Sequence, residues 1–147
     1  MLGFSLIENI ALREAGSRTG LMAWPRLRAR TSALLEEFDI RASAPEDPAA
    51  VLSGGNQQKL VLARELGDAP PLLVAENPTR GLDLRASSAV HARLRAARDA
   101  GMGIVVYSSD LDELLALADR TFAIYDGVLG ETVPDRDRIG QAMLGAV

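Results

Sequence analysis

Apolar residues in the first third of the chain recur at the spacing of α-helices. Residues 4–14 place apolar side chains on one helical face, and Ser5 stands where it can cap the first turn. A second helical pattern covers residues 25–38 and begins at Pro25, which suits the first turn of a helix. A break that contains glycine, serine and threonine separates the two helices, and the proline-containing stretch 40–50 predicts a loop.

The rest of the chain alternates helical and strand-like patterns. Two short apolar runs predict buried strands, and Asp126-Gly127 between two further runs predicts a hairpin. The expected elements are a helix over 56–66, a strand over 72–75, a helix over 84–100, a strand over 104–107, a helix over 110–118, two strands over 121–125 and 128–132, and a last helix opened by Pro134. This order predicts an α/β fold with a parallel sheet fronted by a helical layer.

Composition restricts the function classes without choosing among them. A chain of 147 residues suits one domain with a core, and its net charge of -4 argues against nucleic acid as the main partner. The lack of cysteine excludes disulfides and argues against the usual structural zinc site. No stretch reaches the ~18 apolar residues that a membrane span needs, and the N-terminal segment has no basic leader. We therefore expect a cytoplasmic protein.

The segment 52–59, Leu-Ser-Gly-Gly-Asn-Gln-Gln-Lys, carries the most informative chemistry. Two glycines before a helix allow backbone N–H groups to approach an anion closely. Ser53 adds a hydroxyl donor, and the helix N-terminus adds the positive end of its dipole. These features predict a phosphate-binding site, here called the phosphate seat. On the residues alone, a glycine turn that only caps the helix remains an equal alternative.

Further segments, which follow in a fixed order, favour the phosphate seat. Residues 52–59 resemble the signature motif of ATP-binding cassette (ABC) proteins. Residues 72–79 resemble the Walker B strand and its exit, residues 81–83 resemble the D-loop, and residues 108–113 occupy the place of the switch-histidine segment. The resemblance covers nearly the whole chain. It implies a partial ABC ATPase fold of the P-loop NTPase class, with a helical subdomain followed by parallel strands, flanking helices and a terminal hairpin.

The residues of these motifs are similar to those of the simple-sugar and nucleoside importer branch of ABC proteins. Asn56 stands where most ABC proteins have glutamine, and residues 77–83 read Asn-Pro-Thr-Arg-Gly-Leu-Asp. In that branch one polypeptide usually carries two ATP-binding domains, and this chain looks like the later portion of the second. The resemblance divides it into a helical subdomain with the signature, residues 1–66, and a part with Walker B, D-loop and switch segments, residues 67–147. The P-loop strand and the Q-loop glutamine are expected before Met1.

Several catalytic positions depart from the family pattern. No Gly-Lys-[Ser/Thr] sequence is present, and the single lysine, Lys59, follows a glutamine, so these residues contain no P-loop. Glu76 replaces the Walker B aspartate, from where it can reach Mg²⁺ through water. Asn77 replaces the catalytic glutamate, and Ser109 replaces the switch histidine. Because an amide cannot take up a proton at neutral pH, we expect poor ATP hydrolysis at the chain's own site, and whether the chain alone is an enzyme stays open.

The resemblance implies ATP and Mg²⁺ as cofactors and a division of labour between two domains. The intact signature would contribute in trans to an ATP site on a P-loop-bearing partner domain. Further implied partners are transmembrane permease subunits, which hold the chain at the inner face of the membrane, and indirectly a substrate-binding protein; no nucleic acid is expected. Asp83 is expected to cap the following helix as well. The residues expected to contact nucleotide are Ser53, Gly54, Gly55, Asn56, Gln57 and Asp83.

Two other functions compete with this interpretation. The first is a truncated, non-functional remnant of such a subunit, because a cassette without half of its core would expose an apolar sheet face. The second is the ABC-type head of a chromosome or repair ATPase. Such heads are joined to coiled coils, and the sequence contains no heptad tract, which disfavours this alternative.

Overall fold

The computed structural model describes residues 1–14 and 20–146, which form two compact units. One unit comprises Met1–Leu73 and Thr79–Gly103, and the other comprises Val74–Pro78 and Ile104–Val147. The break that we expect between the first two helices falls mainly on residues 15–19, outside the described residues.

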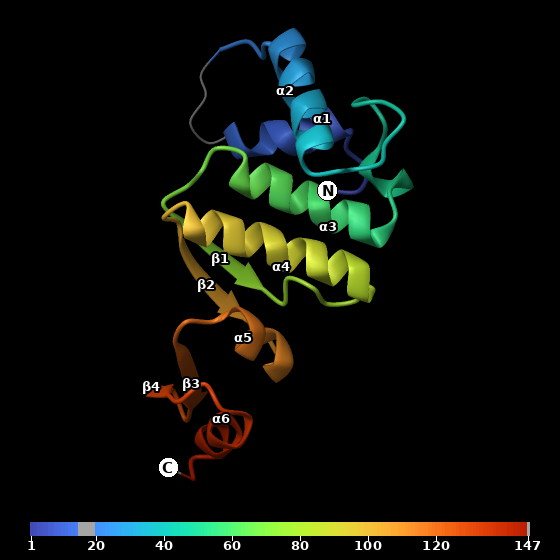
Figure 1. Cartoon of the computed structure of the whole chain (residues 1–147). Coiled ribbons are helices and arrows are strands. Elements are labelled where there is room, and N and C mark those ends of the chain that lie inside the picture. Colours follow the sequence, from blue (N-terminus) through green and yellow to red (C-terminus); the bar gives the residue numbers. More distant parts are fainter. Residues whose placement is uncertain (15–19, 147) are drawn as a thin grey trace. The chain divides into compact units, whose positions relative to one another are not determined.

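The first unit is built mainly from helices (Figure 1). Its elements are α1 (Leu6–Ala11), η1 (Leu12–Glu14), α2 (Trp24–Glu37), η2 (Ala49–Val51), α3 (Gly54–Leu66) and α4 (Leu84–Asp99), where η denotes a 3₁₀ turn. α1 and α2 pack against each other, both contact α3, and α3 also packs against α4. The side chains of Leu6, Ile10, Leu27 and Val90 are almost completely buried within this unit. Burial of one such side chain contributes about 1.5–3 kcal/mol, so the helical layer has a core of its own.

Capping residues explain where these helices begin. Ser5 and Glu8 form a reciprocal capping box at α1: Ser5 Oγ accepts from Glu8 N at 3.2 Å, and Ser5 N donates to Glu8 Oε2 at 2.7 Å. Pro25 occupies the first turn of α2. Asp83 caps α4, because its Oδ1 accepts from Ala86 N at 2.8 Å. The capping roles expected for Ser5 and Asp83 are confirmed.

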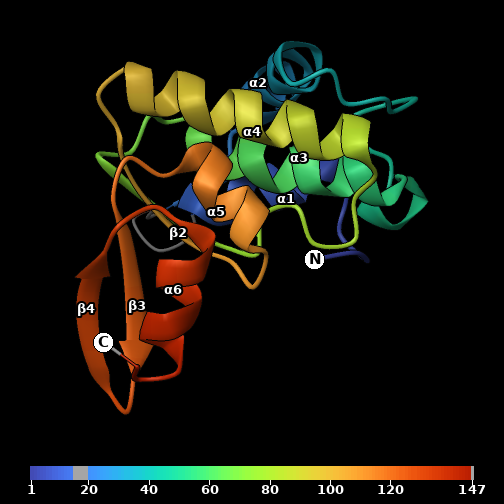
Figure 2. The same ribbon diagram turned by 60° about the horizontal axis from the view of Figure 1, so that its bottom comes forward.

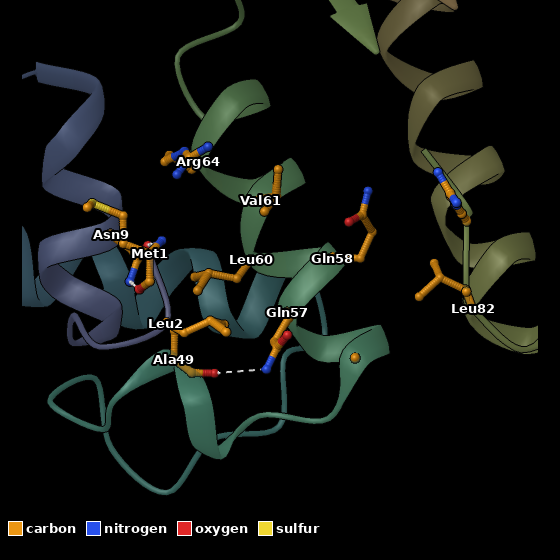
Figure 3. A pocket seen from close by; sticks show the side chains of 13 residues that line it. Met1, Leu2, Asn9, Ala49, Gln57, Gln58, Leu60, Val61, Arg64 and Leu82 are labelled. Atoms are coloured by element: carbon orange, nitrogen blue, oxygen red, sulfur yellow. Dashed lines mark hydrogen bonds between the residues drawn. The ribbon is translucent and has the colours of Figure 1, made fainter. Parts of the chain in front are cut away.

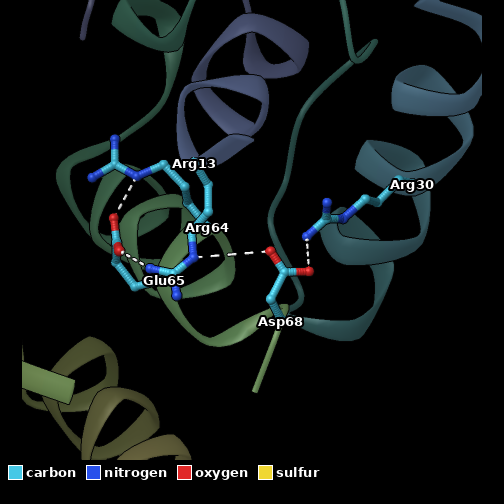
Figure 4. Close-up of polar contacts among 5 residues, drawn as sticks. All are labelled: Arg13, Arg30, Arg64, Glu65 and Asp68. Atoms are coloured by element: carbon cyan, nitrogen blue, oxygen red, sulfur yellow. Dashed lines mark hydrogen bonds and ion pairs between the residues drawn. The ribbon is translucent and has the colours of Figure 1, made fainter. Parts of the chain in front are cut away.

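A group of ion pairs joins η1, α2 and the end of α3 (Figure 4). Glu65 accepts from Arg13 at 2.8 Å and from Arg64 at 2.7 Å, while Asp68 pairs with Arg30 at 2.5 Å and with Arg13 at 3.9 Å. These side chains are partly exposed, and such pairs contribute only about 0–1 kcal/mol each. Their main effect is therefore to orient the helices, whereas apolar burial supplies most of the stability.

β1 (Leu72–Glu76) and β2 (Gly103–Tyr107) form a two-stranded sheet. Gly103 N donates to Pro71 O at 3.0 Å where the strands begin, and Asn77 N donates to Tyr107 O at 2.7 Å where they end. Because these bonds join start to start and end to end, the strands run parallel, as expected, with α4 as their connection.

The expectation that both strands are buried is wrong. Val74, Val105 and Tyr107 are 67%, 53% and 59% exposed, whereas Leu73 is only 8% exposed. A parallel sheet is normally covered on both faces. Within the described residues one set of alternating side chains remains open to solvent, which periodicity along the sequence cannot reveal.

A hairpin and two short helices make up most of the second unit. Its remaining elements are α5 (Leu111–Leu117), β3 (Thr121–Tyr125), β4 (Val128–Thr132) and α6 (Arg136–Met143). β3 and β4 pair antiparallel, from Thr121 opposite Thr132 to Tyr125 opposite Val128. The expected turn is confirmed: Asp126 and Gly127 have φ angles of 48° and 77°, the left-handed values of a tight hairpin turn.

α6 packs against both strands of the hairpin (Figure 2). Ile139 of α6 and Ala123 of β3 are buried in this unit. Asp135 is the N-cap of α6 and accepts from Asp137 N at 3.1 Å, so Pro134 precedes the helix and does not open it, contrary to expectation. In the described part of the chain, no helix has both the length and the apolar character needed to cross a membrane.

Candidate functional site: the signature turn and the ends of β1 and β2

The signature turn, residues 53–56 at the N-terminus of α3, is the expected phosphate seat. Ser53 is the N-cap residue, and Gly54 and Gly55 form the first turn, so the expectation that both glycines precede the helix is wrong. The first N–H groups of an α-helix have no partner within the helix. In the described chain no acceptor binds the N–H of Gly54, Gly55 or Asn56, or the hydroxyl hydrogen of Ser53. These donors stand at the positive end of the helix dipole, an arrangement that suits an anion.

Two side chains on one face of α3 hold the segment that follows α2. Asn56 Nδ2 donates to Ser53 Oγ at 3.2 Å, and Asn56 Oδ1 accepts from Arg41 N at 3.3 Å. One helical turn further on, Lys59 Nζ donates to the carbonyl oxygen of Asp39 at 2.7 Å and to its Oδ2 at 2.9 Å. The hydrogen bond and the charge of Lys59 lower the pKa of the Asp39 carboxyl. These hydrogen bonds hold residues 39–41 against α3.

The side chain of Gln57 binds the backbone of residues 49–52, which precede the phosphate seat. Its Nε2 donates to the carbonyl oxygens of Ala49 at 3.3 Å and Leu52 at 3.0 Å, so the side chain points toward η2 (Figure 3). A cavity of about 330 Å³ lies beside this side chain, and Gln58 and Leu82 also line it. Its lining mixes apolar residues and amides with two arginines, Arg64 and Arg80.

The two glycines of the turn have different surroundings. A Cβ at Gly55 would lie 3.2 Å from the Cβ of Ala86 in α4, which is closer than ordinary van der Waals contact. A Cβ at Gly54 would meet nothing within 4 Å. Gly55 is therefore needed for the close approach of α3 to α4, whereas the space at Gly54 is open. Ala86 links this packing to Asp83, whose carboxylate accepts from Ala86 N.

In the second unit, Asn77 and Ser109 bind each other. Asn77 Oδ1 accepts from Ser109 N at 3.1 Å and from Ser109 Oγ at 3.3 Å. Asn77 has a φ of 44°, a left-handed conformation that asparagine adopts more readily than most residues. Because a backbone N–H can only donate, the amide oxygen must face Ser109 and the NH₂ group must face elsewhere. The pair thus contains no group that can act as a base at neutral pH.

The acidic residues near these strand ends do not form a metal cage. Glu76 is exposed at the end of β1. Asp110 caps α5 by accepting from the N–H groups of Asp112 and Glu113, and Ser108 Oγ donates to the buried Glu113 carboxylate at 2.5 Å. Within residues 1–14 and 20–146, no group of three or more His, Cys, Asp or Glu residues could hold a metal ion. Glu76 alone offers a single carboxylate.

The expected site residues are divided between the two units. Those of the signature and D-loop lie in the first unit, and those of the Walker B and switch segments lie in the second: Ser53, Gly54, Gly55, Asn56, Gln57 and Asp83 in one, Glu76, Asn77 and Ser109 in the other. Sequence reasoning missed three residues that support the seat, namely Arg41, Ala49 and Ala86. They act through backbone groups or close packing, and a backbone group has no sequence signal.

Curated relatives align with nearly the whole chain. The nucleoside import ATP-binding protein NupA of Lactococcus lactis is 39% identical over 153 residues, which cover 99% of this chain and 30% of that protein. The glucose import ATP-binding protein TsgD13 of Haloferax volcanii is 42% identical and covers 96% of this chain, and the ribose import ATP-binding protein RbsA 1 of Rhizobium johnstonii is 35% identical and covers 97%. The chain spans 28% and 29% of these two proteins. No protein-family model matches it.

Solved structures show the same fold. The ATP-binding cassette MJ0796, in a dimeric post-hydrolysis state with ADP and Pi, superimposes with a TM-score of 0.70 at 23% identity and covers 89% of this chain. A metal-chelate type ABC transporter in an inward-facing conformation gives a TM-score of 0.74 at 18% identity and covers 98%. The chain spans 58% and 57% of these two structures. The α/β architecture is therefore that of a partial ATP-binding cassette, as the motifs predict.

Proposed function

We propose that this chain, which belongs to the ATP-binding cassette proteins of sugar and nucleoside import and spans part of one, supplies the signature half of an ATP site. The P-loop of that site would lie on a partner domain. The observation that carries the proposal is the contrast between two places. The signature turn keeps Ser53 and the first N–H groups of α3 available as donors, while Asn77 and Ser109 bind each other.

The signature turn fits a triphosphate in its chemistry. A phosphate oxygen is an acceptor with negative charge, and the turn offers a hydroxyl, backbone N–H groups and a positive dipole end. Ser53, Gly54 and Gly55 would hold the terminal phosphate, and the open surface at Gly54 would allow it to approach the backbone. Asp83, the N-cap residue of α4, would act as the D-loop residue of the same nucleotide-binding surface.

Hydrolysis at the chain's own catalytic positions would be poor. General-base assistance contributes about 10²–10⁴ to a rate, and Asn77 cannot provide it. Its oxygen, the only acceptor of the side chain, is already bound to Ser109. Mg²⁺, when bound with ATP, would neutralise phosphate charge. Glu76 could add one carboxylate oxygen or a water-mediated contact, so the ion would arrive with the nucleotide rather than occupy a site built by these residues.

The relatives extend the proposal to transport. They are named for import of nucleoside, glucose and ribose, which are chemically related polar ring compounds. We infer that the chain takes part in ATP-driven uptake of a simple sugar or nucleoside and lies at the cytoplasmic face of the membrane. Permease subunits would contact the helical part, residues 1–66, and a substrate-binding protein would act indirectly. Residues 67–147 would form the Walker B, D-loop and switch part of the same domain.

A mixing experiment tests the proposal. The purified chain is assayed for Mg-ATP binding and hydrolysis alone, and then together with a P-loop-bearing ATP-binding domain of the same transport system. We expect no hydrolysis by the chain alone and a gain in the mixture that Ser53→Ala lowers about 10- to 100-fold. Hydrolysis by the chain alone would contradict the assignment of Asn77 and Ser109. A partner that hydrolyses ATP equally fast with and without the chain would contradict the contribution in trans.

One observation favours a second candidate, a remnant without a transport role. Val74, Val105 and Tyr107 expose apolar surface on the parallel strands, as expected for an incomplete core. Thermal unfolding with sedimentation distinguishes the candidates. A single cooperative melt of a soluble monomer supports a functional unit. Aggregation without a cooperative transition, both alone and beside the partner domain, supports the remnant.

A further inference from the structure

We propose that Asn56 is a positioning residue that turns the hydroxyl hydrogen of Ser53 toward bound phosphate. This inference rests on the proposed function of the signature turn, and it assigns to Asn56 a role other than contact with nucleotide. The side chain stands between two protein groups, Ser53 Oγ at 3.2 Å and Arg41 N at 3.3 Å.

The backbone of Arg41 determines the direction of the amide. Its N–H can only donate, so the Asn56 oxygen must face Arg41 and the NH₂ group must face Ser53. The Ser53 oxygen therefore receives a hydrogen from Asn56. Because two hydrogens cannot point at each other, the hydroxyl hydrogen of Ser53 must turn away from Asn56. No described acceptor binds it there, and it is left to donate outward.

The arrangement differs from an ordinary helix cap. A serine at the N-cap usually accepts from the backbone N–H two or three residues later, but Ser53 makes no such bond. Its partner is the side chain of Asn56, the third residue of the helix. The backbone N–H groups of the first turn thus stay available. Asn56 in this way preserves both the hydroxyl donor and the N–H donors of the seat.

The backbone of Arg41, which orients Asn56, is itself held in place. Lys59 lies three residues after Asn56, on the same face of α3, and binds both the carbonyl and the carboxylate of Asp39. Arg41 follows two residues later in the same segment. A displacement of residues 39–41 would therefore move the Asn56 amide and, through it, the hydroxyl of Ser53. This connects the segment after α2 to the phosphate seat.

Asn56→Asp separates positioning from simple support. The carboxylate has nearly the shape of the amide and still accepts from Arg41 N, but its second oxygen now accepts from Ser53. The hydroxyl hydrogen then turns inward and is lost to phosphate. Hydrogen bonds to charged groups are worth about 1.5–3 kcal/mol, so we expect ATP hydrolysis in the mixture to fall about 10- to 100-fold, similar to Ser53→Ala.

The double variant controls for the added charge. If Asn56 acts through Ser53, then Asn56→Asp causes no further loss once Ser53→Ala is present. If the new carboxylate repels phosphate directly, the double variant loses more than Ser53→Ala alone, and the inference is refuted. Wild-type hydrolysis by Asn56→Asp in the mixture would refute it as well. A structural role alone would not give this non-additive pattern.

A second measurement needs no partner domain. In the ¹H–¹⁵N spectrum of the full chain, the side-chain NH₂ resonances of Asn56 should move in Ser53→Ala, because one hydrogen loses its acceptor. Unmoved resonances refute the geometry of Asn56 whatever the mixing experiment shows. Moved resonances together with a wild-type mixture that hydrolyses no ATP refute instead the proposed function, and with it the role of the hydroxyl in binding phosphate.

Discussion

Exchange of each signature glycine for alanine tests the steric roles of Gly54 and Gly55. Both lie in the first turn of α3. A Cβ at Gly54 finds nothing within 4 Å, whereas a Cβ at Gly55 comes within 3.2 Å of the Cβ of Ala86. Gly54→Ala should therefore leave the fold unchanged, and Gly55→Ala should force α3 and α4 apart by a few tenths of an ångström.

The magnitudes follow from two opposing terms. Alanine is favoured over glycine in a helix by up to about 1 kcal/mol, and this term is the same for both variants. Overpacking of a close contact costs about 1–3 kcal/mol and applies only to Gly55→Ala. The free energies of unfolding of the two variants should thus differ by about 1–3 kcal/mol. For a chain of this size, that difference corresponds to melting temperatures about 2–12 °C apart.

Urea unfolding followed by circular dichroism at 222 nm measures the difference. We expect Gly54→Ala to be as stable as wild type or slightly more stable, and Gly55→Ala to be the less stable of the two. In the mixture with the P-loop-bearing domain, Gly54→Ala should nevertheless lose ATP hydrolysis, because its methyl group occupies the open surface in front of the donors. Equal stability of the two variants would refute the steric argument. A fully active Gly54→Ala would refute the approach of phosphate at this point.

Three further changes have defined outcomes. Thr31 Oγ1 is the buried side-chain oxygen or nitrogen found without a hydrogen-bond partner among the described residues, so Thr31→Val should raise the free energy of unfolding by about 1–2 kcal/mol, whereas Thr31→Ser should not. The hydrogen bonds from Ser5 lower the pKa of Glu8 below 4.5. Their stabilising effect is present above pH 4.5 and is lost as the pH falls through the lowered pKa, so wild type should lose more stability in acid than Glu8→Gln. An NMR titration that gives Glu8 a pKa of 4.5 or above would contradict this. Asn77→Asp should keep the exchange protection of the Ser109 amide, and the chain alone should still hydrolyse no ATP, because its residues contain no P-loop. Asn77→Ala should lose that protection, and unchanged protection in this variant would count against the hydrogen bond.

Local features of the fold could be predicted from the sequence because they depend on neighbouring residues. Ser5 and Asp83 cap their helices as expected, since an N-cap side chain binds a backbone N–H only a few residues away. Asp126-Gly127 forms the hairpin turn because these residue types tolerate positive φ. The ordered motifs likewise indicated the cassette family, which the relatives support over nearly the whole chain.

Only the tertiary structure showed which distant residues act together. Ser109 binds an asparagine 32 residues away, and Arg41 orients Asn56 through a backbone group that every residue possesses. The exposure of Val74 depends on which elements cover the strand, and apolar periodicity gives the same signal whether or not that cover exists. A sequence specifies the chemistry of each group, but hydrogen bonds and burial depend on distances between segments. Those distances are properties of the folded chain.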